Sequence, residues 1–485
     1  MDDLRPPSTG VNDSPAAYGY TPELRRTLGS FQVFAVSFAF ISVAVGIFAT
    51  YDNLLTSGGP VGIWTWPVAF AGQLLVALVV AQFAARIPLS GSSYQWASRL
   101  ANPRIGWIFG WLTFCYLITG LMAIDNAMAS QCLMPLLGIA PDETTARVLT
   151  VVILLVQAGL AIGSTRIVGM VNSVAVGVEV AIVVVLVVGL LVAVAVTGDG
   201  SVGNLTSRGV TAGSGDYWAF GGGIMATIIV GLATLVGFDS AANMAEEART
   251  PHRTVPRAIV GSVVAAGILG MLFLIALTVA IDDVDRVSKS GSPVADILRT
   301  QLGSPMERIL LVCVAVAFFG GGLVTMTSCA RMVFAMSRDG RFPGHRVLRR
   351  VNATTKTPIG ATVLPLTIGV ITMIVLPGDA LIELITAGTL FPAITYGFIV
   401  VLYLAVRKRL SHTEGAFSLG RFDTAVAVLA LVWTIAAVVI LVAPGTTTST
   451  VIVVGLIALG ALYLASMLVF RRSALAAQPP AATGS

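Results

Sequence analysis

Long apolar segments recur along the whole chain, and they limit its possible folds more than any other feature. A helix needs about 17–25 mostly apolar residues to cross a hydrocarbon core of about 30 Å. Backbone polar groups in lipid must be satisfied within their own segment, so such segments form helices. We therefore predict an all-α polytopic membrane protein with about 12 transmembrane helices, at residues 31–50, 64–85, 105–133, 146–163, 167–196, 219–244, 258–281, 309–336, 359–376, 380–406, 424–443 and 451–470.

The composition agrees with this class. Hydrophobic residues make up 56% of the 485 residues and charged residues only 11%, which is too few charges to cover a soluble protein of this size. Residues 1–27 are polar, and no cleavable signal peptide is evident before the first apolar segment. We expect residues 1–27 and 473–485 to be disordered cytoplasmic tails, with a single transmembrane domain at 28–472.

Basic residues indicate the orientation in the membrane. With the N-terminus inside, 23 of the 29 Lys and Arg residues fall on the cytoplasmic side. We therefore expect both termini in the cytoplasm of a multi-pass plasma membrane protein whose basic loops contact anionic lipid. Membrane topology explains the basic character better than a nucleic-acid partner does. The outer six are Arg147, Arg208, Arg286, Lys289, Arg299 and Arg308.

Two apolar segments contain residues that an uninterrupted membrane helix avoids. Segment 219–244 includes Gly237, Phe238, Asp239 and Ser240, and an ionisable residue at such a depth usually has a role. Segment 31–50 contains a patch of small residues at 42–46. The two positions lie five helices apart, as expected for a five-plus-five inverted repeat with discontinuous helices one and six. The alternatives are a kink capped by Asp239 in the sixth segment and ordinary small-residue packing in the first.

Several functional classes lack their usual sequence features. The four cysteines have no paired spacing for zinc or disulfides, and the three histidines fall in polar loops, so we expect no metal and no cofactor. An embedded nucleophile with a histidine base, as in a membrane enzyme, is missing. The sequence also has no phosphate-binding loop of a primary pump. An ion channel is a less favoured alternative because no repeated filter sequence is present.

Several short motifs are distributed along the chain. Residues 237–240 are followed by Met244-Ala245-Glu246-Glu247 and Pro251. Others are Gly58-Gly59-Pro60, Pro88-Leu89-Ser90-Gly91 continuing to Trp96, Ser337-Arg338-Asp339-Gly340 and Lys356-Thr357-Pro358. In these motifs the chain resembles the amino acid–polyamine–organocation superfamily of permeases, and within it the amino acid/choline transporter family. Together these motifs cover essentially residues 28–472, so the resemblance implies a permease domain with a LeuT-like fold.

In that fold, unwound parts of helices one and six bind the substrate halfway across the membrane. The resemblance implies that the first break binds a carboxylate through free N–H groups and that carbonyls of the second bind an amine. Phe238 would cover the ligand, and Glu246 with Glu247 would belong to a charge network at the inner gate. The implied substrate-binding residues are Ser42, Ala44, Val45, Gly46, Val236, Gly237, Phe238 and Asp239.

Two further buried acids are candidates for ion coupling. Many relatives have Asn in the fifth span followed seven residues later by Lys, whereas here Asn172 is followed by Glu179. A carboxylate at this position can take up a proton or bind a cation, although a structural role is the alternative. Asp125 in the third span is the second candidate, either for coupling or for attracting a cationic substrate.

These observations predict secondary active import of an amino acid or a related amine such as GABA, coupled to protons. The alternatives are a choline- or polyamine-type organocation transporter and an amino acid exchanger. We expect the protein to act as a monomer or a weak homodimer. The residues that distinguish between these substrates cannot be identified from a single sequence.

Overall fold

The structure is a computed structural model that describes residues 29–88, 92–163, 165–243, 245, 248–352, 357–376, 380–410, 417–443 and 447–476. Regular secondary structure in these residues is helical, which confirms the predicted all-α fold. Ten described helical stretches are long and apolar enough to cross a membrane. Two shorter apolar stretches, Gly223–Thr234 and Ile359–Val375, lie at the sixth and ninth predicted positions.

Most of the predicted spans correspond to one α-helix each, but the first and sixth are divided. The first span consists of α1 (Ser30–Ile41) and α2 (Val43–Gly58), and the sixth of α9 (Gly223–Ala226), α10 (Ile229–Thr234) and α11 (Ser240–Asn243). The other long helices are α3 (Trp66–Arg86), α5 (Pro103–Ala127), α7 (Glu143–Gly163), α8 (Thr165–Thr197), α12 (Pro251–Val279), α14 (Pro293–Arg338), α16 (Ile359–Val375), α17 (Ala380–Val406), α18 (Asp423–Val442) and α19 (Thr447–Phe470).

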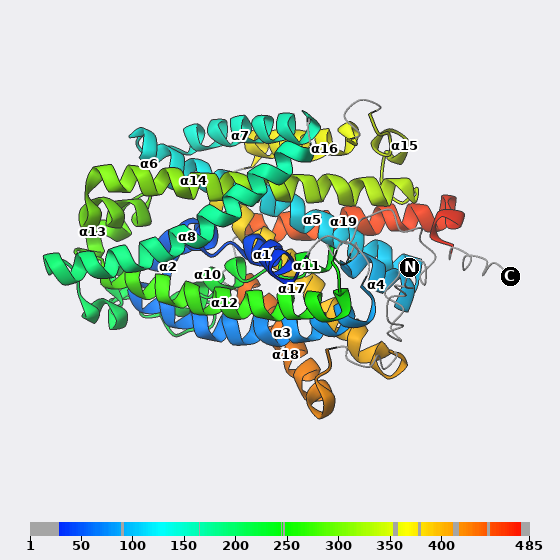
Figure 1. Cartoon of the computed structure of the whole chain (residues 1–485), viewed down its shortest axis with the longest axis horizontal. Helices are drawn as coiled ribbons and strands as arrows, with labels where there is room; N and C mark the ends of the chain where they lie inside the picture. Colours follow the sequence, from blue (N-terminus) through cyan, green and yellow to red (C-terminus); the bar gives the residue numbers. More distant parts are fainter. Residues whose placement is uncertain are drawn as a thin grey trace, which may run out of the picture.

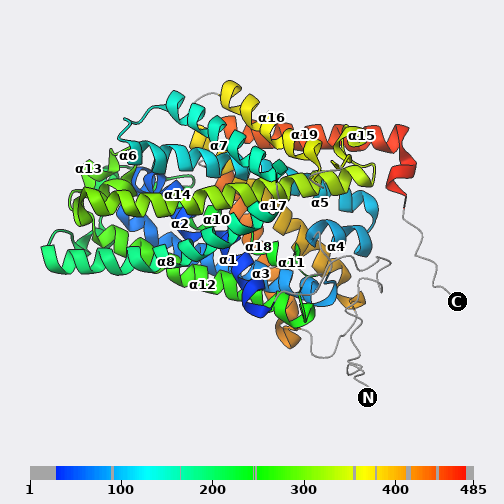
Figure 2. The same ribbon diagram turned by 45° about the horizontal axis from the view of Figure 1, so that its top comes forward.

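The long helices form an elongated bundle whose two ends carry the shorter elements (Figure 1). At one end lie α4 (Ser92–Leu100) and α15 (His345–Leu348), from loops predicted to be cytoplasmic. At the other end lie α6 (Met134–Leu137) and α13 (Val284–Ser288), from loops predicted to be outside. Figure 2 shows α7 and α16 on one side of the bundle, α3 and α12 on the other, and α14 along its length.

Small residues let the helices approach closely. The ring of Trp66 on α3 packs over α12, where a Cβ atom on Gly270 would lie 2.1 Å from the ring, and its Nε1 donates a hydrogen bond of 2.8 Å to the Gly267 carbonyl. Close approach at glycine is the usual basis of helix association in membranes. Large exposed apolar side chains such as Val184 and Val188 lie on α8, as expected for a lipid-facing surface.

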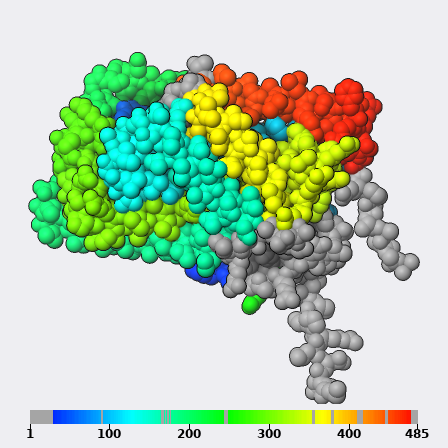
Figure 3. Space-filling model, turned by 90° about the horizontal axis from the view of Figure 1, so that it is seen from above, coloured from blue at the N-terminus to red at the C-terminus, as the bar shows by residue number. Residues whose placement is uncertain are grey.

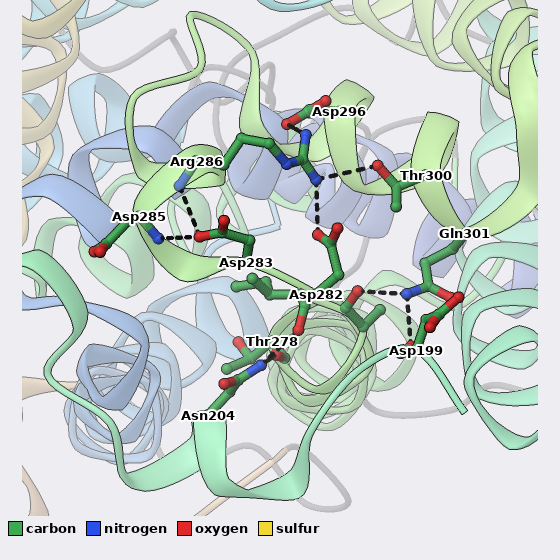
Figure 4. Close-up of polar contacts among 12 residues, drawn as sticks. Asp199, Asn204, Thr278, Asp282, Asp283, Asp285, Arg286, Asp296, Thr300 and Gln301 are labelled. Carbon is green, nitrogen blue, oxygen red and sulfur yellow. Dashed lines mark hydrogen bonds and ion pairs between the residues drawn. The ribbon is translucent and has the colours of Figure 1, made fainter. Parts of the chain in front are cut away.

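A group of polar contacts, here named the outer clamp, joins four elements at the end that is predicted to face outside (Figure 4). Arg286 of α13 donates hydrogen bonds of 2.7 Å to Asp282 and 2.6 Å to Asp296, the latter on α14. Gln301 of α14 donates to the backbone carbonyls of Asp199 and Ala280, at 2.7 and 2.8 Å. The outer clamp thereby ties the ends of α8 and α12 to α13 and α14.

Candidate functional site

The first helix is broken at Ser42. This residue has φ 46° and ψ 79°, in the left-handed region that costs a non-glycine residue about 1–2 kcal/mol. The Ser42 N–H donates back to the Phe38 carbonyl at 3.1 Å, and the Gly46 N–H donates to the Ser42 carbonyl at 2.9 Å. The N–H groups of Val43, Ala44 and Val45 therefore form the first turn of α2 and have no hydrogen-bond partner within that helix. The predicted break at 42–46 is present, although the Gly46 N–H is already used within the helix.

The sixth helix is broken between α10 and α11. Residues 235–239 are not helical, and Gly237 at the centre has φ +80°, a conformation that favours glycine. The Gly237 carbonyl accepts a hydrogen bond of 3.0 Å from the Ser240 N–H. The Phe238 carbonyl accepts one of 2.9 Å from the Ser37 hydroxyl of α1. The position of this break agrees with the prediction from the sequence.

The two breaks lie against each other. A Cβ atom on Gly46 of α2 would lie 2.2 Å from the Thr234 hydroxyl oxygen at the end of α10. A Cβ atom on Gly237 would lie 2.4 Å from the ring of Phe40 on α1. Both breaks therefore depend on glycine for this close approach, and their free backbone groups belong to one region of the molecule.

A tyrosine from α17 organises the second break. The Tyr396 hydroxyl accepts a hydrogen bond from the Gly237 N–H and donates one to Asp239 Oδ1, each 3.0 Å long. Its ring stacks on Phe238 with centroids 4.8 Å apart, and both side chains are buried. The Ser92 hydroxyl of α4 donates to the other Asp239 oxygen at 3.2 Å. Asp239 thus has two hydroxyl donors, and Phe238 lies in a covered position.

Glu179 lies at the first break. It belongs to α8, is 3% exposed, and its carboxyl group is within interaction range of the Ser42 hydroxyl and the Val43 N–H. Glu179 Oε1 and Ser42 Oγ have no hydrogen-bond partner among the described residues. The N-terminus of a helix favours a negative charge, so this carboxyl group occupies the position that an anionic ligand would seek. The side chain of Asn172 lies outside the described residues.

Asp125, the second residue predicted for ion coupling, lies on α5, is 0% exposed and accepts a hydrogen bond of 2.8 Å from Gln157 of α7. Glu246 and Glu247, predicted for the inner gate, lie outside the described residues. The described part of the chain contains no group of three or more His, Cys, Asp or Glu residues placed to hold a metal ion.

A cavity of about 170 Å³ lies along the same helices that carry the breaks, toward the end that is predicted to face outside. It is lined by residues of α2, α9, α10, α17 and α18, including Asn53, Ser57, Ile229 and Thr386. Three of these helices continue inward to Gly46, Thr234 and Tyr396. The cavity is therefore suited to be an outer approach to the breaks.

Sequence reasoning did not identify Tyr396, Ser37 or Ser92. Tyr396 and Ser37 are polar residues within apolar spans, a signal that is present in the sequence but shared with many helix-packing residues. Their role becomes visible only when α1, α4 and α17 are brought to the second break.

Residues 28–470 match the family model described as amino acid permease. Similar curated proteins include amino-acid permease BAT1 of Arabidopsis thaliana, which is 27% identical over 86% of this chain and 85% of its own length. The amino-acid permease BAT1 homolog of Oryza sativa is 26% identical over 86% of this chain and 84% of its own length. The GABA-specific permease of Saccharomyces cerevisiae is 26% identical over 78% of this chain and 70% of its own length.

Proposed function

This chain belongs to the amino acid permease family, which makes it a transporter and not an enzyme, and we propose that it imports an amino acid or a related amine such as GABA by proton-coupled secondary transport. The name of the yeast relative supports GABA as one candidate substrate. The single observation that carries the proposal is the juxtaposition of the two helix breaks at Ser42 and Gly237.

The breaks offer complementary groups to a substrate with a carboxylate and an ammonium. The N–H groups of Val43, Ala44 and Val45 are suited to a carboxylate. The backbone carbonyls at Val236, Gly237 and Phe238 are suited to an ammonium. Those of Gly237 and Phe238 each accept one hydrogen bond within the protein, and a carbonyl oxygen has a second lone pair for a ligand. Such a site can bind a zwitterion out of water through backbone groups alone, without a charged side chain paired with its carboxylate or its ammonium group.

Coupling follows from the place of Glu179. An ionised Glu179 and a substrate carboxylate would compete for the same positive end of α2 and would repel each other. Protonation of Glu179 removes this repulsion, so proton binding and substrate binding favour each other by linkage. Release of the proton on the inner side would then promote release of the substrate. A strict sodium requirement would instead make Glu179 part of a cation site.

The test is Glu179→Gln in protein reconstituted into liposomes. Glutamine resembles the protonated acid, so this variant should keep substrate exchange but lose accumulation driven by a proton gradient. Its substrate affinity should also become independent of pH near neutrality. The matched control is Glu143→Gln, since Glu143 lies at the outer end of α7 in an ion pair with Arg147. Accumulation retained by Glu179→Gln would show that another group couples transport.

A choline- or polyamine-type substrate is the alternative of the same class. Such a cation has no carboxylate to bind at the first turn of α2, so an ionised Glu179 would not repel it. It should therefore bind more tightly when Glu179 is ionised. A thermal-shift screen with amino acids, GABA, choline and polyamines at several pH values distinguishes these cases. Large uncoupled currents in the same liposomes would indicate a channel, and obligatory counterflow would indicate an exchanger.

We place both termini and His252, His345 and His412 on the cytoplasmic side of the plasma membrane. Glu246 and Glu247, together with Arg249 and Arg253, would then form part of an inner gate. The excess of basic residues on that side supports this orientation. A single cysteine at position 345, in a variant without the four native cysteines, should react with a membrane-impermeant thiol reagent only after the membrane is opened. Labelling of position 345 in intact cells would show that the orientation is the opposite of the one proposed.

A further inference from the structure

A second buried acid lies apart from the breaks, between α5, α7 and α14. Asp125 and Gln157 are both 0% exposed. Gln157 Nε2 donates to Asp125 Oδ1 at 2.8 Å and lies 3.5 Å from the Phe319 carbonyl of α14, so both hydrogens of its NH₂ group face acceptors. The amide orientation is therefore set by its neighbours. Gly322 of α14 leaves the room for the pair, since a Cβ atom there would lie 2.3 Å from Asp125 Oδ1 and from Gln157 Nε2.

The remaining oxygen atoms of the pair lack partners. Asp125 Oδ2 and Gln157 Oε1 are both buried without a hydrogen bond among the described residues. Both are acceptors when the acid is ionised, and a buried acceptor without a donor costs about 1–3 kcal/mol. An ionised carboxylate buried here would cost more. One proton on Asp125 Oδ2 converts it into a donor for an acceptor such as Gln157 Oε1 and removes the negative charge as well.

The described residues of α5, α7, α14 and α16 place no other charged side chain within two turns of the pair to compensate an ionised Asp125. A cluster of buried apolar residues lies beside the pair: Leu121 on α5, Leu154 and Ala158 on α7, and Met326 on α14. From α16, Met373 lies near the neighbouring Asn126. The nearest ionisable groups on these helices are Cys132 and Cys329, about two turns away, and the nearest charged group on α7 is Arg147, about 15 Å along its axis.

Two helices cover the pair on the side surface of the bundle. Figure 3 shows α7 in cyan and α16 in yellow side by side on this face. The two helices are in close contact, since a Cβ atom on Gly369 of α16 would lie 2.7 Å from Leu154 of α7. The pair thus lies between α5, α7 and α14, next to the contact of α7 with α16.

We propose that Asp125 and Gln157 form a buried proton-binding site, in which a neutral carboxylic acid and a carboxamide are paired by two hydrogen bonds. The proton stays on Asp125 throughout the transport cycle, because neither ionisation nor exchange with water is favourable in this enclosure. Asp125 is then not a coupling group. It joins α5 to α7 and α14, and the site forms whatever substrate the protein carries.

Infrared spectroscopy of the purified protein tests this assignment. A protonated carboxylic acid has a carbonyl stretching band separate from that of ionised carboxylates. The wild-type protein should keep such a band from about pH 5 to about pH 9, well above the usual pKa of aspartic acid. The band should be lost in Asp125→Asn, shifted in Gln157→Met and unchanged in the control Glu143→Gln, which removes a carboxylate that is ion-paired with Arg147.

Transport provides the second measurement. Because asparagine is also neutral and similar in shape, Asp125→Asn should keep proton-driven accumulation within about twofold of the wild type. A missing band in the wild type, or its persistence in Asp125→Asn, would overturn the proposal. Loss of accumulation with retained exchange in Asp125→Asn would make Asp125 a coupling group instead. A sodium-dependent stabilisation that requires Asp125 would show a cation site. If Asp125→Asn does not fold, the band shift in Gln157→Met decides.

Discussion

Two serines adopt a left-handed backbone conformation that residues other than glycine rarely adopt. Among the described residues, Ser42 and Ser92 are the only non-glycine residues with positive φ, at 46° and 42°. Ser42 forms the first break, and Ser92 donates to Asp239 at the second. Such strain persists where the surrounding structure enforces it, and it is concentrated at functional sites. Both strained residues therefore point to the same region as the two broken helices.

Gly237 gives the most direct test of the second break. Alanine at φ +80° costs about 1–2 kcal/mol, and its Cβ atom would lie 2.4 Å from Phe40. Gly237→Ala should weaken substrate binding at least tenfold while the protein still elutes as a folded species, and Gly237→Leu should abolish binding. The measurement is substrate affinity by calorimetry or thermal shift.

Gly189→Ala is the matched control for Gly237→Ala, since a Cβ atom at that glycine of α8 meets nothing within 4 Å. Unchanged affinity in Gly237→Ala would move the substrate site away from this break, and with it the role assigned to Asp239.

The position of the second break could be predicted from the sequence because its signal is local. Gly237 and Asp239 indicated a break because glycine and a carboxylate are unusual inside one apolar run. Ser42 was included only as part of a small-residue patch, since nothing in the sequence shows which residue takes the left-handed conformation. The partners Tyr396 and Gln157 were not predicted, because a single sequence does not show which faces of distant helices meet.

At the scale of elements, local hydropathy located the spans but not their internal breaks or ends. The sixth predicted span, 219–244, contains three short helices, and the described helical part begins only at Gly223. Glycines at 221–223 favour turn conformations there, and Gly221 has φ +79°. Likewise, α14 begins at Pro293, well before the predicted span at 309–336, and contains a non-helical residue at Gly303. The inverted repeat remains a prediction.

The outer clamp is an element-level feature with a predictable pH dependence. Partial burial raises the pKa of Asp282, but hydrogen bonding and the charge of Arg286 outweigh this and hold the pKa below its usual value of 3.8. A carboxyl group with a lowered folded-state pKa stabilises the fold above its unfolded pKa, and this contribution is lost as the pH falls through the lowered value. The clamp should therefore stay closed down to about pH 4.

Arg286→Ala tests the clamp. Surface ion pairs contribute about 0–1 kcal/mol each, so the variant should unfold at a slightly lower temperature at neutral pH. The difference from the wild type should shrink below about pH 4, where Asp282 becomes protonated. Thermal unfolding at a series of pH values measures both, with the exposed Arg308→Ala as the control. A difference that does not depend on pH would mean that Arg286 acts through packing.

For the whole molecule, the class and number of spans followed from the sequence because burial in lipid imposes a minimum length on every helix. The arrangement of these helices did not follow, since it depends on contacts between residues far apart in the chain. Asp125 illustrates the difference. Its depth in the third span suggested a place on the transport pathway, but the sequence did not show that its hydrogen-bond partner would be Gln157 of α7.

If Glu179 takes up one proton per substrate, as proposed above, its position beside the breaks also sets the electrical behaviour of the transporter. A zwitterion that enters with one proton carries one net positive charge into the cell. A potential of 100 mV, negative inside, then contributes about 2.3 kcal/mol per cycle. This corresponds to roughly 50-fold accumulation even without a pH difference, because about 1.4 kcal/mol is a factor of ten. The reversal potential measured in liposomes should therefore give one charge per substrate. Two charges per substrate would raise the limit to about 2,000-fold by the same arithmetic and would mean that a second buried acid also releases its proton in each cycle.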